Sequence, residues 1–151
     1  MNPFVYRPTG ATPVSRDATD SSARGTKAIV SISSPGASRV LPEYVVVGAS
    51  KAALEALTRY LAVELSSHNI VVNAISPGVV ETDALKHFDV LEDKGLIDKI
   101  AACTPAGRLT KPEEVAALVA FLCSPQASMI RGQVITIDGG FSLPMGGITF
   151  S

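Results

Sequence analysis

Three side chains have the types and spacing of an acid–base site: Ser34, Tyr44 and Lys51. Tyr44 lies seven residues before Lys51 at the start of a helical segment, and Ser34 lies seventeen residues before the same lysine. Residues seven apart on a helix share nearly one face, roughly 10 Å apart along the axis. A nearby ammonium group favours the phenolate that remains after a tyrosine donates a proton. We therefore predict that Tyr44 donates a proton with support from Lys51, while Ser34 bonds a substrate oxygen.

Apolar, β-branched segments predict strands buried on both faces. They cover residues 27–33, 70–75 and 133–137. Leucines spaced by three and four residues predict a helix over about residues 44–67, in which Glu55 pairs with Arg59 one turn on.

Two more helices are expected before the last strand. A short apolar pattern lies near residues 96–102, and a second helix runs onward from Pro112. Thr110 and Glu113 have the spacing of a capping box around that proline, which suits the first helical position.

The order strand, helix, strand, long connection, helix, strand predicts a parallel α/β sheet. Ligands of such sheets bind beyond the carboxyl ends of the strands. Polar and turn residues follow each predicted strand, at residues 33–34, 76–78 and 138–140. We therefore expect a site at this edge, with the Ser33 hydroxyl capping backbone and Asp138 anchoring a turn rather than catalysing.

Composition limits the function classes. The 151 residues suffice for about one domain, and a net charge of −1 gives no general case for nucleic-acid or membrane partners. Cys103 and Cys123 lack metal-ligand spacing, so we expect no metal site and two reduced thiols in a cytoplasmic setting. We interpret residues 1–26 as a flexible leader, 27–143 as the domain and 144–151 as a tail.

Residues 27–143 resemble the short-chain dehydrogenase/reductase family. The resemblance rests on Ser34, Tyr44 and Lys51, on PGVVET at residues 77–82 and on RGQVITIDGG at residues 131–140. Most family members have a tyrosine four residues before the lysine, where this chain has Val47. A tyrosine seven residues before it is similar to the enoyl-acyl-carrier-protein reductases, and SKAALEALTRYLAVELS resembles their NADPH-dependent bacterial type.

The resemblance implies a reductase of fatty-acid biosynthesis. It would reduce the C2=C3 bond of a trans-2-enoyl thioester, on acyl carrier protein or coenzyme A, with NADPH or alternatively NADH. Lys51 would also hold the nicotinamide ribose, while Pro77, Gly78 and Thr82 would frame the nicotinamide. The segment after Thr82 would form an apolar-lined lid over the acyl chain. The long helix would pair with its mate in a homodimer or tetramer.

The displaced tyrosine has a physical interpretation. In a 2-enoyl thioester the hydride arrives at C3 while charge develops on the thioester oxygen, which is two bonds further from the hydride-accepting carbon than a carbonyl oxygen would be. A shift of three helical positions moves a phenol by about 4.5 Å along the axis. Tyr44 therefore suits the stabilisation of an enolate rather than an alkoxide.

The family's glycine-rich turn, G-x-x-x-G-x-G, does not occur in the sequence. Such a turn at a helix N-terminus receives the pyrophosphate of a dinucleotide. We therefore expect the C-terminal part of a Rossmann-like doubly wound sheet without its N-terminal cofactor-binding half, with poor stability and feeble turnover alone. Two alternatives stay open: a 3-oxoacyl or other carbonyl reductase, against which Val47 argues, and a truncated, non-catalytic dimerising remnant.

Overall fold

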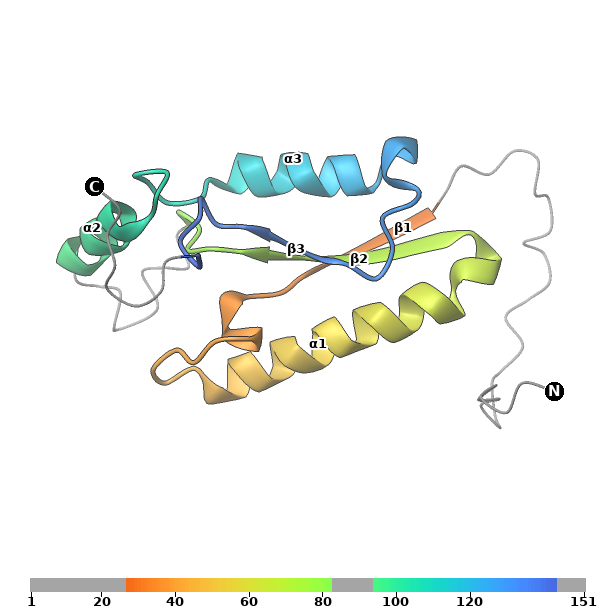
Figure 1. The fold of residues 1–151 in the computed structure, drawn as a ribbon, viewed down its shortest axis with the longest axis horizontal. Coiled ribbons are helices and arrows are strands. Elements are labelled where there is room, and N and C mark those ends of the chain that lie inside the picture. The colour runs from red at the N-terminus through yellow and green to blue at the C-terminus, as the bar shows by residue number, and fades with distance from the viewer. Residues whose placement is uncertain (1–26, 83–93, 144–151) are drawn as a thin grey trace.

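The computed structural model describes residues 27–82 and 94–143, which form a three-stranded parallel sheet between helices (Figure 1). The strands are β1 (Lys27–Ile32), β2 (Ile70–Pro77) and β3 (Val134–Ile137), in the order β1-β2-β3. Helices α1 and α3 cover opposite faces of this sheet in Figure 1. The predicted parallel α/β architecture is therefore confirmed.

The register aligns the three carboxyl ends. Ile32 pairs with Ile75, Pro77 pairs with Ile137, and the Ser33 N–H continues the ladder by donating to the Ile75 carbonyl at 2.7 Å. Strand β2 runs two residues further than predicted because its last residues pair with β3. The residues that follow β1 and β3 therefore flank the end of β2 at one edge of the sheet.

Helix α1 (Val45–Glu64) packs against β2 and ends in a 3-10 turn, η3 (Ser66–His68). Its beginning and end agree with the predicted helix to within a few residues. The predicted ion pair inside it is wrong, because Glu55 accepts a hydrogen bond from the Ser33 hydroxyl at 2.6 Å instead of pairing with Arg59. The same contact corrects the expected role of Ser33, whose hydroxyl bonds a side chain rather than capping backbone.

Helix α3 (Pro112–Leu122) begins one residue later than its predicted capping box requires. Lys111 is the N-cap residue, and its N–H donates to the Glu114 carboxylate at 2.9 Å. Thr110 is held elsewhere, because it forms a parallel bridge with Val80 and its hydroxyl donates to the Ile137 carbonyl. The predicted Thr110–Glu113 capping box is therefore wrong.

The remaining helices among the described residues are α2 (Lys94–Cys103) and two 3-10 turns, η2 (Pro35–Ala37) and η6 (Pro125–Ala127). In Figure 1, α2 lies beyond the arrowheads of β2 and β3, on the same side as the strand tips. The short helix expected near residues 96–102 is thus present. Within the described ranges, no helix is both long and apolar enough to cross a membrane.

The core surrounds β2, the central strand. Ile75 packs with Leu122 of α3 and Ala127 of η6, and all three are at most 1% exposed. Asn73 is fully buried in the same strand, where its amide donates to the Ile130 carbonyl and accepts from the Gln133 N–H. Burial of a polar amide is tolerated here because both of its ends are bonded. The central strand of the sheet, whose end carries part of the candidate site, is therefore almost entirely buried and well packed.

Candidate functional site

Tyr44 and Ser34 meet at the carboxyl end of β1. The Tyr44 hydroxyl lies 3.3 Å from the Ser34 hydroxyl oxygen, and either group can donate. Tyr44 is the N-cap residue of α1, so its backbone is not helical and it stands one residue outside the helix. Ser34 is the N-cap residue of η2, and its hydroxyl accepts from the Gly36 N–H. The phenol thus points toward the end of β1, where the sequence predicts the site.

Two glycines let the turn approach the helix closely enough for this contact. A methyl group on Gly36 would lie 2.5 Å from Cδ1 of the Tyr44 ring, and one on Gly48 would lie 2.6 Å from the Gly36 carbonyl oxygen. Both distances are shorter than any ordinary carbon contact. Neither glycine was predicted from the sequence, although Gly36 lies two residues after Ser34 and Gly48 three residues before Lys51.

Lys51 lies seven residues after Tyr44, about two helical turns further along, and reaches the same strand end. Its ammonium group donates to the Ile32 carbonyl at 2.8 Å. An ammonium group has three N–H donors, so Lys51 retains two for another oxygen. The structure therefore brings the three predicted catalytic residues to one strand end, with Lys51 bonded to the backbone there.

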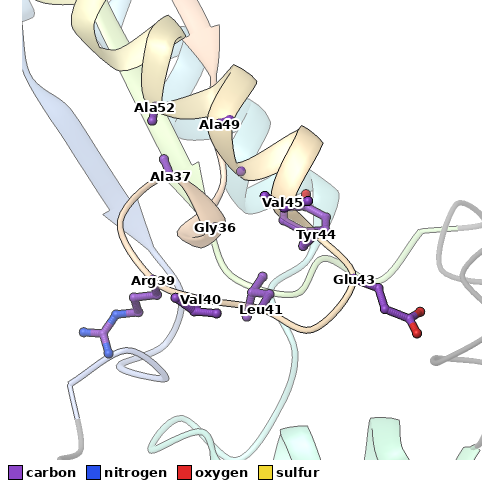
Figure 2. Close-up of a pocket in the computed structure, with 11 residues that line it drawn as sticks. Gly36, Ala37, Arg39, Val40, Leu41, Glu43, Tyr44, Val45, Ala49 and Ala52 are labelled. Atoms are coloured by element: carbon purple, nitrogen blue, oxygen red, sulfur yellow. The ribbon is translucent and has the colours of Figure 1, made fainter.

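A cavity of about 350 Å³ lies against the Tyr44 ring (Figure 2). Figure 2 shows it between the loop that carries Arg39, Val40 and Leu41 and the first turns of α1. Its walls are mostly small or apolar: Gly36, Ala37, Val40, Leu41, Val45, Gly48, Ala49 and Ala52, with Arg39 and Glu43 also lining it. The phenol thus borders a space that suits an apolar group.

This cavity differs from the lid expected after Thr82. Residues 83–93 lie outside the described ranges, and the cavity walls come from the loop between η2 and α1 instead. The short apolar pair Val40-Leu41 is the sequence feature from which this wall of the cavity could have been predicted.

The tips of β2 and β3 are joined through backbone. The Gly78 N–H donates to the Ile137 carbonyl at 3.0 Å, and a methyl group on Gly78 would lie 2.8 Å from Cβ of Asp138. Pro77 has no N–H and is buried, whereas Thr82 is exposed. Of the predicted nicotinamide frame, Gly78 therefore provides close approach rather than a free donor, and the Thr82 hydroxyl is the accessible polar group.

Asp138 anchors the turn after β3, as expected. Its carboxylate oxygens accept from the Gly140 and Ser142 N–H groups, both at 2.9 Å. Burial favours a higher pKa for Asp138, but hydrogen bonds from Ser142 and Gly140, with the nearby Arg39 charge, lower the pKa below its ordinary value. Arg39 also donates to the Ser142 carbonyl, so it connects the cavity loop to this turn.

The polar groups at this edge fit part of a nicotinamide dinucleotide. Lys51 has donors left for a ribose, and the Thr82 hydroxyl is accessible to a carboxamide. The sequence holds no G-x-x-x-G-x-G turn for the pyrophosphate. Among the described residues, no group of three or more His, Cys, Asp or Glu side chains could hold a metal ion. The described cysteines, Cys103 and Cys123, are both free and exposed.

The chain thus combines a three-stranded parallel sheet, covered by helices on both faces, with Ser34, Tyr44 and Lys51 at the tip of β1. The family model described as "Enoyl-(Acyl carrier protein) reductase" matches residues 7–142. The chain therefore belongs to the short-chain dehydrogenase/reductase family. The match begins before residue 27, so the leader boundary at residue 26 stays a prediction.

Curated relatives are similar in sequence over most of this chain, but they are about twice as long. A tropinone reductase homologue of Arabidopsis thaliana is 44% identical over 121 residues, which are 80% of this chain and 45% of the relative. The 1-cyclohexenylcarbonyl-CoA reductase of Streptomyces collinus is 39% identical over 119 residues, which are 76% of this chain and 41% of the relative. The chain thus spans less than half of either relative's length.

Solved structures give the same picture. The 3-ketoacyl-(acyl-carrier-protein) reductase of Brucella melitensis, complexed with NADH, matches with a TM-score of 0.69 and 39% identity. The match covers 77% of this chain and 45% of that one. A gluconate 5-dehydrogenase from Beutenbergia cavernae with bound NADP, described as putative, matches with a TM-score of 0.66 and 37% identity, over 76% of this chain and 45% of that one.

Proposed function

We propose that this chain carries the proton-donating side of an enoyl-thioester reductase. The main support is the contact between the Tyr44 and Ser34 hydroxyls, whose oxygens lie 3.3 Å apart beside the apolar cavity. Val47 occupies the position four residues before Lys51, so no phenol is available at the place where most family members have one. The matched family description and the coenzyme A reductase among the relatives support a thioester substrate.

The chemistry follows from where negative charge develops. When bound, NADPH would supply the hydride that C3 of a trans-2-enoyl thioester, on acyl carrier protein or coenzyme A, accepts. The Tyr44 phenol donates to the thioester oxygen, where the enolate charge gathers. Ser34 donates to the phenolate oxygen and Lys51 supplies positive charge nearby, and both favour the anionic phenol. Lys51 would also hold the ribose, while Pro77 and Gly78 would allow close approach of the nicotinamide and Thr82 would offer it a hydroxyl.

The exposed apolar side chains of α1 support self-association as part of the proposal. Leu57 is 54% exposed, Tyr60 69% and Val63 78%, all on one helix. Burial of such side chains against a second copy removes apolar surface from water. A dimer or tetramer in the cytoplasm, acting in fatty-acid biosynthesis, is the setting that we propose.

The test follows oxidation of NADPH and NADH with crotonyl-CoA and acetoacetyl-CoA offered in parallel. Turnover of the crotonyl substrate alone supports the proposal. Turnover of the acetoacetyl substrate alone contradicts it and favours a carbonyl reductase. Turnover of neither, with a dimer seen by light scattering, favours a non-catalytic dimerising module.

Tyr44→Phe tests the proton donor and Tyr60→Phe is its matched control, because Tyr60 is an exposed tyrosine of the same helix. We expect Tyr44→Phe to lower crotonyl turnover by at least about 100-fold, the range for a lost general acid, while Tyr60→Phe keeps the rate. Full turnover by Tyr44→Phe would remove the role given to that phenol.

A further inference from the structure

Three consecutive residues at the end of β1 are each bonded by a different side chain from α1 or its N-cap. The Ile32 carbonyl accepts from Lys51, the Ser33 hydroxyl donates to Glu55, and the Ser34 hydroxyl contacts Tyr44. The proposed function uses Lys51, Ser34 and Tyr44. Glu55 and Ser33 are left without a role.

The Ser33–Glu55 bond is short and shielded from water. The two oxygens lie 2.6 Å apart, Ser33 is 4% exposed and Glu55 is partly buried. A hydrogen bond from a hydroxyl to a carboxylate is among the stronger kinds, and its loss leaves the carboxylate without a donor in a partly dry place. The bond therefore fixes the orientation of Ser33 relative to α1.

That orientation determines where Ser34 points. Successive side chains of an extended strand lie on opposite faces, so a rotation of the Ser33 residue about the strand axis also swings Ser34. Ser33 is tied on its backbone as well, because its N–H donates to the Ile75 carbonyl. With the side chain held by Glu55 and the N–H held by β2, Ser33 has little freedom left.

Glu55 also lies one helical turn after Lys51, on the same side of α1. The two side chains thus bind the strand end at adjacent residues, Lys51 at Ile32 and Glu55 at Ser33. A helix that is bonded at two points one turn apart cannot slide along the strand without loss of both bonds.

We propose that Glu55 is a positioning residue, which through Ser33 holds the end of β1 so that the Ser34 hydroxyl meets the Tyr44 phenol. Its catalytic meaning rests on the proposed function, whereas its effect on geometry does not. The hydrogen bond to Ser33 is the operative feature, so an amide oxygen at this position should keep most of the effect, although a neutral acceptor binds the hydroxyl less strongly.

The test compares Glu55→Ala and Glu55→Gln with Glu64→Ala, an exposed glutamate of the same helix. The Gly36 amide reports the position of Ser34, because it donates to the Ser34 hydroxyl at 3.3 Å. Amide NMR spectra and hydrogen exchange of Gly36 are therefore measured in all three variants. We expect Glu55→Ala to shift the Gly36 resonance and to lose its exchange protection, while Glu55→Gln and Glu64→Ala resemble the unmodified chain.

Crotonyl turnover is the second measurement. We expect Glu55→Ala to lower kcat by about 10-fold to 100-fold with little change in KM, since misplacement of a reacting group by about 1 Å costs up to that much. Glu55→Gln should recover most of the rate. Should the unmodified chain show no turnover, the proposed function fails while the NMR comparison still decides the role of Glu55.

Two results would overturn the inference: a Gly36 signal in Glu55→Ala that matches Glu64→Ala, or equal perturbation by Glu55→Gln and Glu55→Ala. Should Glu55→Ala fail to fold, Ser33→Ala removes the same bond from the strand side. Ser33→Ala must then perturb the Gly36 amide, and an unaltered amide in that variant would equally overturn the inference.

Discussion

The end of β1 and the ends of β2 and β3 lie along one edge of the sheet, but different groups hold them. At β1 the contacts come from side chains: Lys51, Glu55 and Tyr44 reach Ile32, Ser33 and Ser34. At β2 and β3 the contacts are largely backbone contacts, such as the Gly78 N–H on the Ile137 carbonyl.

The difference indicates how each region responds to change. Side chains that reach across from a helix can be removed singly while the strands stay paired. The glycines at the β2 and β3 ends have less freedom, since a methyl group on Gly78 would meet Cβ and Cα of Asp138, and one on Gly139 would meet Ala106 and Thr104. We therefore expect substitutions at the β1 end to alter turnover more than the free energy of unfolding, and substitutions at the β2 and β3 ends to alter mainly the free energy of unfolding.

Gly139→Ala should show the largest effect on the free energy of unfolding. Gly139 has φ +61°, and a methyl group there would lie 2.9 Å from both Cβ of Ala106 and Cγ2 of Thr104. Left-handed strain and overpacking together predict a loss of about 2–5 kcal/mol in urea unfolding. Gly107→Ala is the matched control, because Gly107 has φ +70° with nothing within 4 Å. It should lose only about 1–2 kcal/mol, and equal losses would contradict the packing difference.

Asp138→Asn should have the next largest effect. The carboxylate accepts two backbone N–H groups, and an amide offers only one acceptor oxygen, so we expect a loss of about 1–3 kcal/mol at neutral pH. The folded pKa lies below the ordinary value of 3.8, so the advantage of Asp138 is complete above pH 3.8 and falls as pH drops through the folded pKa. Urea unfolding of both chains between pH 7 and pH 2 measures this, with exposed Asp98→Asn as the control. An advantage that grows on acidification would have the wrong sign.

Gly36→Ala tests the β1 end of the sheet. The atoms that an added methyl group would meet belong to the Tyr44 ring, which can rotate away. We expect a cost below about 1 kcal/mol in unfolding, the range for a local rotamer change. Loss of the Ser34–Tyr44 contact should still lower crotonyl turnover by about 10-fold or more. A large loss of stability with unaltered turnover would mean that the two strand ends do not differ as described.

Glu114→Gln should have the smallest effect. The Arg108 guanidinium, which donates at 2.8 and 2.6 Å, and the Lys111 N–H lower the pKa of Glu114 from 4.5 to about 2. The stabilisation is fully present above pH 4.5 and disappears as pH falls through about 2. Thermal unfolding of Glu114→Gln and of the neighbouring Glu113→Gln across this range should differ slightly at neutral pH and converge in acid. Because the pair is exposed, added salt should shrink the difference.

Much of the fold could be predicted because the relevant signals are local. The β-branched segments form strands as predicted, and their parallel pairing follows from the intervening helices. The predicted burial on both faces holds only for β2, because Ile29 and Ile32 of β1 are 41% and 42% exposed and β3 is half-buried. Ser34, Tyr44 and Lys51 converge because the strand end and the helix start are joined by a short turn. The roles of these residues as catalytic groups stay predictions.

Two wrong predictions, the Glu55–Arg59 ion pair and the Thr110–Glu113 capping box, have the same cause: each involves a residue that contacts a partner distant in sequence. Glu55 prefers a buried hydroxyl 22 residues away over an exposed arginine one turn on, since the shielded bond is stronger. Thr110 pairs with Val80, so it cannot cap the helix that follows. Local spacing suggested the nearer partner in both cases.

The contact between Gly36 and Gly48 has a mechanical consequence. There the Gly36 carbonyl lies so close to Gly48 that even a methyl group on Gly48 would be only 2.6 Å from its oxygen, so no side chain separates the turn from the helix. Thermal displacement of the phenol-bearing end of α1 must therefore follow that of the turn beside it. We therefore expect the distance between the Ser34 and Tyr44 hydroxyl oxygens to change little when the helix as a whole moves.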